Sequence, residues 1–213
     1  MFEILLVITI MAILAIAAMT STINTQRQFV FLNNFKEIFN KIREVRMDAV
    51  TQKAVDLGVP EGMGIPSAYG LYIANDGDLI TVTVFADLTT SDTQNGYDPT
   101  GTGSDVDLGQ PYSFDATKYT LEVADAPSVT NPYTFDTNSN LTFLYSPTEI
   151  KVVASGNITG TGSLQLTGPY IILTLKDTKE PPLTKKISIF LRSGIAEAID
   201  ATTIITPAPV VTP

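Results

Sequence analysis

This chain of 213 residues contains no cysteine, no histidine and no tryptophan. Without cysteine it has neither disulfide bonds nor thiol chemistry. Without histidine it lacks the commonest general base and metal ligand of proteins. Serine–histidine and cysteine–histidine nucleophilic mechanisms are therefore excluded. Carboxylate pairs such as Asp76 and Asp78 lie in predicted turns with no accompanying base or apolar pocket, so we predict no enzymatic activity.

Glycine and proline are also missing from the first quarter of the chain, where the first of each are Gly58 and Pro60. Because these two residues are the main breakers of helices, we predict one unbroken helix of about 54 residues ending at Leu57. At 1.5 Å per residue this helix would be roughly 80 Å long.

The first part of this helix is almost entirely apolar. Between Ile4 and Met19 there is no charged residue, and Thr9 is the only polar one. The run is slightly shorter than the roughly 20 residues that span a bilayer, and it lacks the flanking features of a signal peptide. A membrane anchor is one interpretation. It does not explain Glu3, because a carboxylate beside hydrocarbon is costly without a partner.

The segment Phe2–Leu14 (FEILLVITIMAIL) resembles the mature N-terminus of bacterial type IV pilins and type II secretion pseudopilins. Two residues precede Glu3, where the family usually has four. The resemblance implies a subunit that waits in the inner membrane, is extracted by the pilus assembly machinery and joins further copies in a helical filament outside the cell. It also implies that Glu3 neutralises the N-terminal amine of a neighbouring subunit, which would give a buried charge its partner.

The assembly surface implied by this resemblance comprises Glu3, Ile4, Leu5, Leu6, Val7, Ile8, Ile10, Ile13 and Leu14. A looser resemblance to the minor-pilin branch runs through Phe39–Val50, Tyr69–Ile73 and Val84–Leu88. It leaves open whether the subunit is major or minor.

The second part of the predicted helix is amphipathic. Apolar residues recur every three or four positions, which places them on one face: Phe31, Phe35, Ile38, Phe39, Ile42, Val45 and Ala49. We expect this face to pack on a globular domain. Beyond it, short alternating segments bounded by Gly, Asp, Asn and Pro indicate strands.

We predict strands at Ala68–Ile73, Leu79–Ala86, Tyr119–Ala124, Leu141–Tyr145, Ile150–Ser155, Ser163–Leu166, Tyr170–Lys176 and Thr184–Arg192. The last two should form an antiparallel pair. The expected fold class is therefore α+β and type IV pilin-like, with the long helix packed on an antiparallel sheet or sandwich.

Four regions follow from these patterns: residues 1–26 as the transmembrane or filament-core half of the helix, 27–57 as its amphipathic half, 58–201 as a β-rich head, and 202–213 as a Thr/Pro-rich tail. The formal net charge of the chain is −9. Because most of the acidic residues follow Leu57, we predict no nucleic-acid partner.

Two clusters in the head bear on ligands. The loop Asp87–Gln110 is rich in oxygen ligands, and Asp92, Asn95 and Asp98 would suit a structural calcium ion. We favour the alternative that this loop is a solvated cluster of turn residues, and we predict no other cofactor.

Five basic residues, Lys176, Lys179, Lys185, Lys186 and Arg192, could contact DNA. We interpret them instead as protection of exposed strand edges.

The sequence thus predicts a structural subunit of an extracellular type IV pilus or related filament. Two alternatives stay open: a minor pseudopilin of a type II secretion system, and a membrane-anchored surface binding module that does not polymerise.

Overall fold

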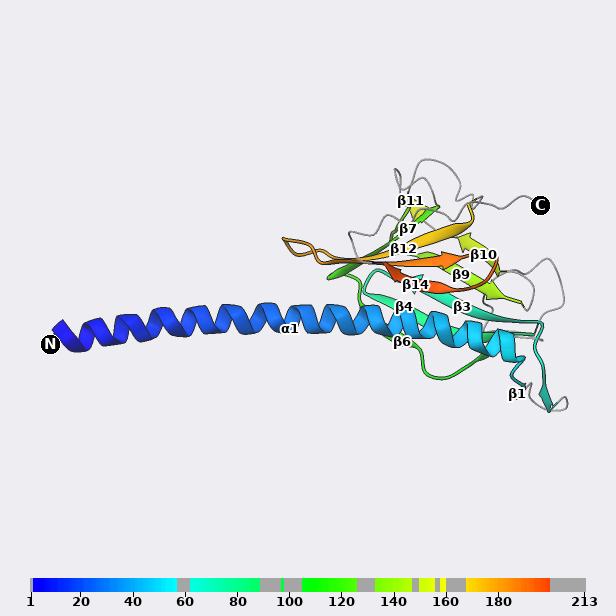
Figure 1. Ribbon diagram of the computed structural model, residues 1–213, viewed down its shortest axis with the longest axis horizontal. Coiled ribbons are helices and arrows are strands. Elements are labelled where there is room, and N and C mark those ends of the chain that lie inside the picture. The colour runs from blue at the N-terminus through cyan, green and yellow to red at the C-terminus, as the bar shows by residue number, and fades with distance from the viewer. Residues whose placement is uncertain are drawn as a thin grey trace, which may run out of the picture. The chain divides into compact units, whose positions relative to one another are not determined.

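A computed structural model describes residues 2–56, 62–88, 97, 105–125, 133–146, 150–155, 158–159 and 168–199 of this chain. The helix α1 extends from Phe2 to Thr51, and every regular element after it in these ranges is a strand (Figure 1). The chain divides into two compact units, Met1–Lys36 and Glu37–Pro213. The second unit therefore contains the end of α1 together with all the strands.

Two antiparallel sheets of six strands make up most of the second unit. The first sheet has the order β10-β9-β3-β4-β5, with β6 also paired to β4. The second has the order β11-β8-β7-β12-β13-β14. A small third sheet pairs β1 with β2. The strands are β1 Val55–Asp56, β2 Met63–Gly64, β3 Ala68–Asn75, β4 Leu79–Asp87, β5 Val106–Asp107, β6 Tyr112–Asp115, β7 Tyr119–Asp125, β8 Tyr133–Phe135, β9 Ser139–Tyr145, β10 Ile150–Ser155, β11 Ile158–Thr159, β12 Tyr170–Asp177, β13 Thr184–Phe190 and β14 Ala196–Ile199.

The long strands agree with the prediction, and the antiparallel pairing of β12 with β13 is confirmed, with Leu173 opposite Ile187. The segment Ser163–Leu166, which we predicted as a strand, lies outside the described residues.

The predicted fold class is wrong. In the described part of the chain strand residues outnumber helical ones, and most of them lie in two six-stranded sheets, so the structure is mainly β instead of α+β. The coarser expectation of one long N-terminal helix followed by antiparallel sheet agrees with the structure. Several strands are only two to four residues long, too short to show the alternation of period two that reveals a strand in a sequence. The predicted helix of about 54 residues is also too long, since α1 has 50 residues and Val55–Asp56 form a strand.

The helix ends early because Gln52 turns the backbone. Gln52 has a φ of 49°, in the left-handed region that usually favours glycine. The Lys53 N–H donates to the Asp48 carbonyl at 3.1 Å, and the Gln52 N–H donates to the Ala49 carbonyl at 3.4 Å. These two bonds are the pattern of a Schellman motif, which satisfies the last carbonyls of a helix. Gly58 and Pro60 therefore do not end the helix.

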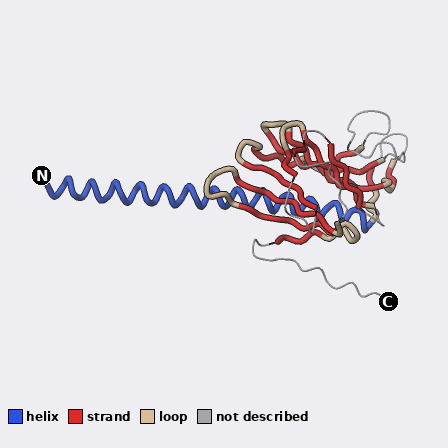
Figure 2. Tube along the Cα trace, turned by 90° about the horizontal axis from the view of Figure 1, so that it is seen from above, coloured by secondary structure: helices blue, strands red, loops and turns tan. Residues whose placement is uncertain are grey.

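The predicted apolar face of α1 is largely buried. In the second unit Ile38, Ile42, Val45 and Ala49 are at most 2% exposed, and this part of the helix runs alongside the strands (Figures 1 and 2). In the first unit Phe31 and Phe35 are buried as well. The sheets contribute the rest of the core, with fully buried side chains such as Leu71, Phe143, Leu121, Ile171 and Leu173.

Candidate assembly surface

All nine residues of the predicted assembly surface lie on the first turns of α1, and all are exposed. Ile8 and Leu14 are each 63% exposed. Glu3 lies in the first turn of the helix, where the free N–H groups of the backbone favour a negative charge.

This surface is apolar on every side of the helix. Successive residues of an α-helix lie about 100° apart, so the consecutive residues Ile4 to Ile8 already cover its whole circumference. Exposed apolar side chains continue along the same unit through Met11, Ile16, Met19 and Ile23. Most surface helices have a polar face for water, and the described stretch Ile4–Leu14 has none, since Thr9 is its only polar residue.

Two described hydroxyl groups of the first unit form hydrogen bonds inside the helix. The Thr9 hydroxyl donates to the Leu5 carbonyl at 2.8 Å, and the Thr22 hydroxyl donates to the Ala18 carbonyl at 3.0 Å. Such bonds to the preceding turn let a hydroxyl enter an apolar environment without losing its hydrogen bond. The Thr9 and Thr22 hydroxyl groups therefore do not depend on water for a hydrogen bond. Within the described residues, none of the helices combines the length and the apolar character needed to cross a membrane.

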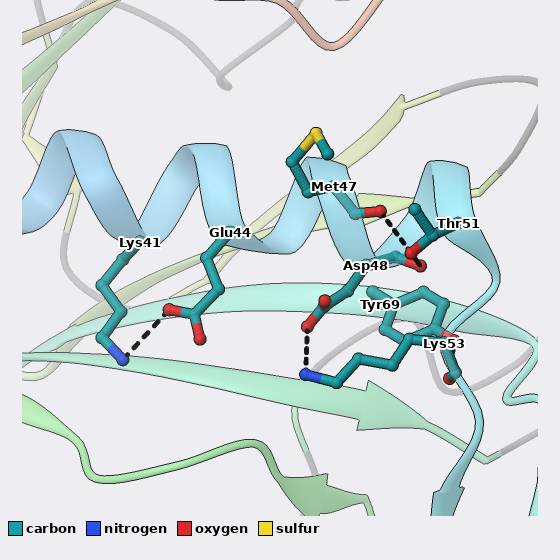
Figure 3. A network of polar contacts seen from close by, with 7 residues as sticks. All are labelled: Lys41, Glu44, Met47, Asp48, Thr51, Lys53 and Tyr69. Atoms are coloured by element: carbon teal, nitrogen blue, oxygen red, sulfur yellow. Dashed lines mark hydrogen bonds and ion pairs between the residues drawn. The ribbon is translucent and has the colours of Figure 1, made fainter.

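A polar network that the sequence did not predict holds the end of α1 in the second unit (Figure 3). The Tyr69 hydroxyl on β3 donates to the Lys53 carbonyl. The Lys53 ammonium lies 3.4 Å from the Asp48 carboxylate, and the Thr51 hydroxyl donates to the Met47 carbonyl at 2.8 Å. Burial and the nearby Asp48 carboxylate raise the pKa of Tyr69, so its hydroxyl stays protonated as a donor. The network ties the helix end to the first sheet.

The three residues proposed for calcium, Asp92, Asn95 and Asp98, lie outside the described residues. In the same loop of the sequence, Tyr97 is described. Its ring centroid lies 4.7 Å from that of Tyr72 and 4.9 Å from that of Phe85. Its hydroxyl donates to the Asp107 carboxylate at 2.6 Å. Burial and this hydrogen bond raise the pKa of Tyr97. In the ranges that the structure describes, no group of three acidic residues is placed to hold a metal ion.

Two of the five basic residues, Lys176 and Lys186, do not protect strand edges as we predicted, because strands pair on both sides of them. Lys176 lies on β12, which is flanked by β7 and β13, and Lys185 and Lys186 lie on β13, which is flanked by β12 and β14. The Lys176 ammonium contacts the Glu122 carboxylate on β7 at 2.5 Å. The lysine therefore bridges two interior strands of the second sheet.

Four turns of the second unit meet at one end of the sheets. The Ala116 N–H donates to the Asp78 carbonyl at 2.9 Å, and the Asn138 N–H donates to the Asn75 carbonyl at 2.7 Å. The Thr178 N–H donates to the Lys118 carbonyl at 3.0 Å. The carboxylates gathered on these turns are Asp76, Asp78, Asp115, Asp136 and Glu180. We call this the acidic turn end; the sequence offered no signal for it, because its turns are far apart along the chain.

Comparison with known proteins gives no relative: no protein-family model, no curated protein and no solved structure matches this chain.

Proposed function

We propose that this chain is a structural subunit that polymerises through the Glu3–Leu14 surface of α1 into an extracellular filament. The observation that carries the proposal is the exposure of large apolar side chains on all sides of α1 from Phe2 to Met19. Function would reside in the polymer, and the subunit itself would perform no chemistry.

The physical reason is the cost of leaving such a surface in water. Burying one Leu or Ile side chain is worth about 1.5–3 kcal/mol, and the surface presents eight large apolar residues besides Glu3. A single partner would cover only one side of a helix. A bundle of helices from several copies, at interaxial distances of about 8–10 Å, covers all sides together.

The second unit fits the outside of such a filament. It contains the folded core, and residues from Gly58 onward carry most of the acidic groups of the chain. A net negative charge favours solubility of the polymer surface.

The resemblance of Phe2–Leu14 to pilins and pseudopilins supports the same arrangement. It adds the inner membrane and an assembly machinery as partners before polymerisation. The proposal covers a pilus and a secretion pseudopilus alike, because both use a core of bundled N-terminal helices.

The test is polymerisation of the purified full chain when detergent is removed, followed by sedimentation and electron microscopy. We expect filaments from the unchanged chain and none from Ile8→Asp, because a carboxylate in the middle of the surface would have to be buried. Met63→Asp is the matched control: Met63 is 68% exposed, similar to Ile8, but lies on β2 in the second unit, and its filaments should be unaffected.

Equal polymerisation of the Ile8→Asp chain and the unchanged chain would contradict the proposal. So would single chains that bind lipid vesicles and never polymerise, a result that favours the anchored binding module.

A further inference from the structure

The outward side of α1 in the second unit carries an exposed strip of three residues, Arg43, Met47 and Val50. Their spacing of four and three places them on one face of the helix, away from the buried face of Ile42 and Val45. Met47 is 55% exposed and Val50 is 63% exposed. We call these three residues the outward strip.

The charge of Arg43 is not neutralised by a carboxylate within the described ranges. Its guanidinium lies over the Phe39 ring, 5.7 Å from the centroid. The neighbouring carboxylate of Glu44 pairs instead with Lys41, at 3.3 Å. Arg43 is thus an exposed cation beside two exposed apolar side chains.

The complementary features occur in the turn between β3 and β4, part of the acidic turn end. Asp76 and Asp78 are exposed there, and Leu79 beside them is 43% exposed. The Asp76 carboxylate accepts the N–H groups of Asp78 and Leu79, at 3.0 and 2.7 Å, which fixes the shape of the turn. Neither carboxylate forms an ion pair in the described part of the chain. The turn therefore offers two negative charges beside an exposed leucine.

These two surfaces belong to different elements of the second unit. The outward strip lies on α1, whereas Asp76 and Asp78 lie in the turn that follows Asn75 at the end of β3. A contact between two different surfaces of one chain joins copies head to tail, and such a contact can repeat without closing.

We propose that the outward strip of one copy binds the β3–β4 turn of a second copy, with Arg43 facing Asp76 and Asp78 and with Met47 and Val50 packed on Leu79. This contact rests on the proposed filament function, because a polymer of like-oriented subunits brings different surfaces of neighbouring second units together. Arginine forms the stronger, often bidentate, type of ion pair with carboxylates, and the apolar residues exclude water from it. The contact fixes the orientation of neighbouring second units relative to each other in the filament.

The absence of cysteine allows a direct test by cross-linking in the full chain. Chains with Met47→Cys are mixed with chains carrying Leu79→Cys, assembled and mildly oxidised. We expect mixed dimers between the two variants to exceed both kinds of like dimer. Replacing the first partner by Met63→Cys is the control and should remove the mixed dimer. Like dimers alone, or no dimers, would overturn the contact.

Reversing the charges of the contact gives a second test, in which a double variant restores a pair of opposite charges. Arg43→Glu and Asp78→Lys should each raise the critical concentration for polymerisation at least about tenfold, because they place like charges together. The double variant should return close to the unchanged value. If Ile8→Asp abolishes filaments while neither reversal changes the critical concentration, the contact is wrong and the filament proposal stands. If the unchanged chain forms no filament, the filament proposal fails, and the cross-linking yield in detergent solution still decides the contact.

Discussion

Glu3 is the only charged residue among the first 26 positions of the chain. Its neighbours on α1 are exposed and apolar, so any assembly that buries them also buries this carboxylate. A buried charge requires a partner of opposite charge. Removing either member of the pair leaves the other buried without compensation, which is strongly destabilising. In the filament that we propose, this partner would be the N-terminal amine of another copy.

We therefore expect Glu3→Ala to assemble poorly, since it leaves the amine of the neighbouring copy buried without its counter-charge. The measurement is the amount of polymer that sediments after detergent removal. Glu197→Ala, at an exposed position on β14, is the control and should assemble normally. Unchanged assembly of Glu3→Ala would remove Glu3 from the assembly surface.

Among the glycines that the structure describes, Gly70 has the least room for a side chain. A Cβ at this position on β3 would lie 2.0 Å from the ring of Phe85 on β4. Gly70→Ala should lower the free energy of unfolding by about 1–3 kcal/mol, the usual cost of overpacking a core. Urea unfolding of the full chain checks this value. Adding Phe85→Leu should recover part of the loss, and an unchanged unfolding midpoint for Gly70→Ala would contradict the packing described for this pair.

Asp115 gives the chain a predictable response to acid. Hydrogen bonds from Lys118 and Thr117 lower its pKa from 3.8 to about 2. A lowered pKa in the folded state means a stabilising contribution that is fully present above pH 3.8 and is lost as the pH falls toward 2. The unfolding midpoints of the unchanged chain and Asp115→Asn should therefore converge over this range. A difference that stays constant between pH 5 and pH 2 would show that Asp115 does not titrate in this way.

At the scale of elements, the end of α1 depends on a residue whose conformation the sequence does not reveal. Glutamine rarely adopts the left-handed conformation, yet Gln52 has a φ of 49°. The helix was predicted to continue because no glycine occurs before Gly58. The local ion pair of Lys53 with Asp48 and the tertiary hydrogen bond from the Tyr69 hydroxyl to the Lys53 carbonyl hold this turn, and a tertiary contact of this kind is invisible to local propensity.

Gln52→Gly should stabilise the second unit by up to about 1 kcal/mol, because glycine adopts a positive φ without the strain of a Cβ. Gln52→Val should destabilise it, since a β-branched residue tolerates this conformation worst. Chemical unfolding of the two variants beside the unchanged chain measures both effects. A lower stability for the glycine variant would indicate that helix α1 does not end in the left-handed turn.

The strands show the same limit of prediction. Long strands with clear alternation, such as β3 and β12, could be placed within one or two residues. Short ones such as β5 and β14 exist because a neighbouring strand offers its free hydrogen-bonding edge. Their sequences carry no period of their own. The division of the strands into two sheets follows from such pairings and not from any one segment.

For the whole molecule, the Glu3–Leu14 surface and the acidic turn end differ in how far the sequence predicts them. The Glu3–Leu14 surface could be named from the sequence, because it is one continuous segment with an unbroken apolar character. The acidic turn end could not, because the topology brings together turns around Asp76, Asp115, Asp136 and Glu180. A filament would use the Glu3–Leu14 surface in its core and the acidic turn end between neighbouring second units.

A reconstruction of the assembled full chain by electron microscopy tests most directly whether the first half of α1 forms the core of a polymer. We predict filaments in which residues 2–19 of many copies pack together at interaxial distances of about 8–10 Å, with the second units outside. A polymer held together by its second units, with residues 2–19 left outside the core, would contradict the account.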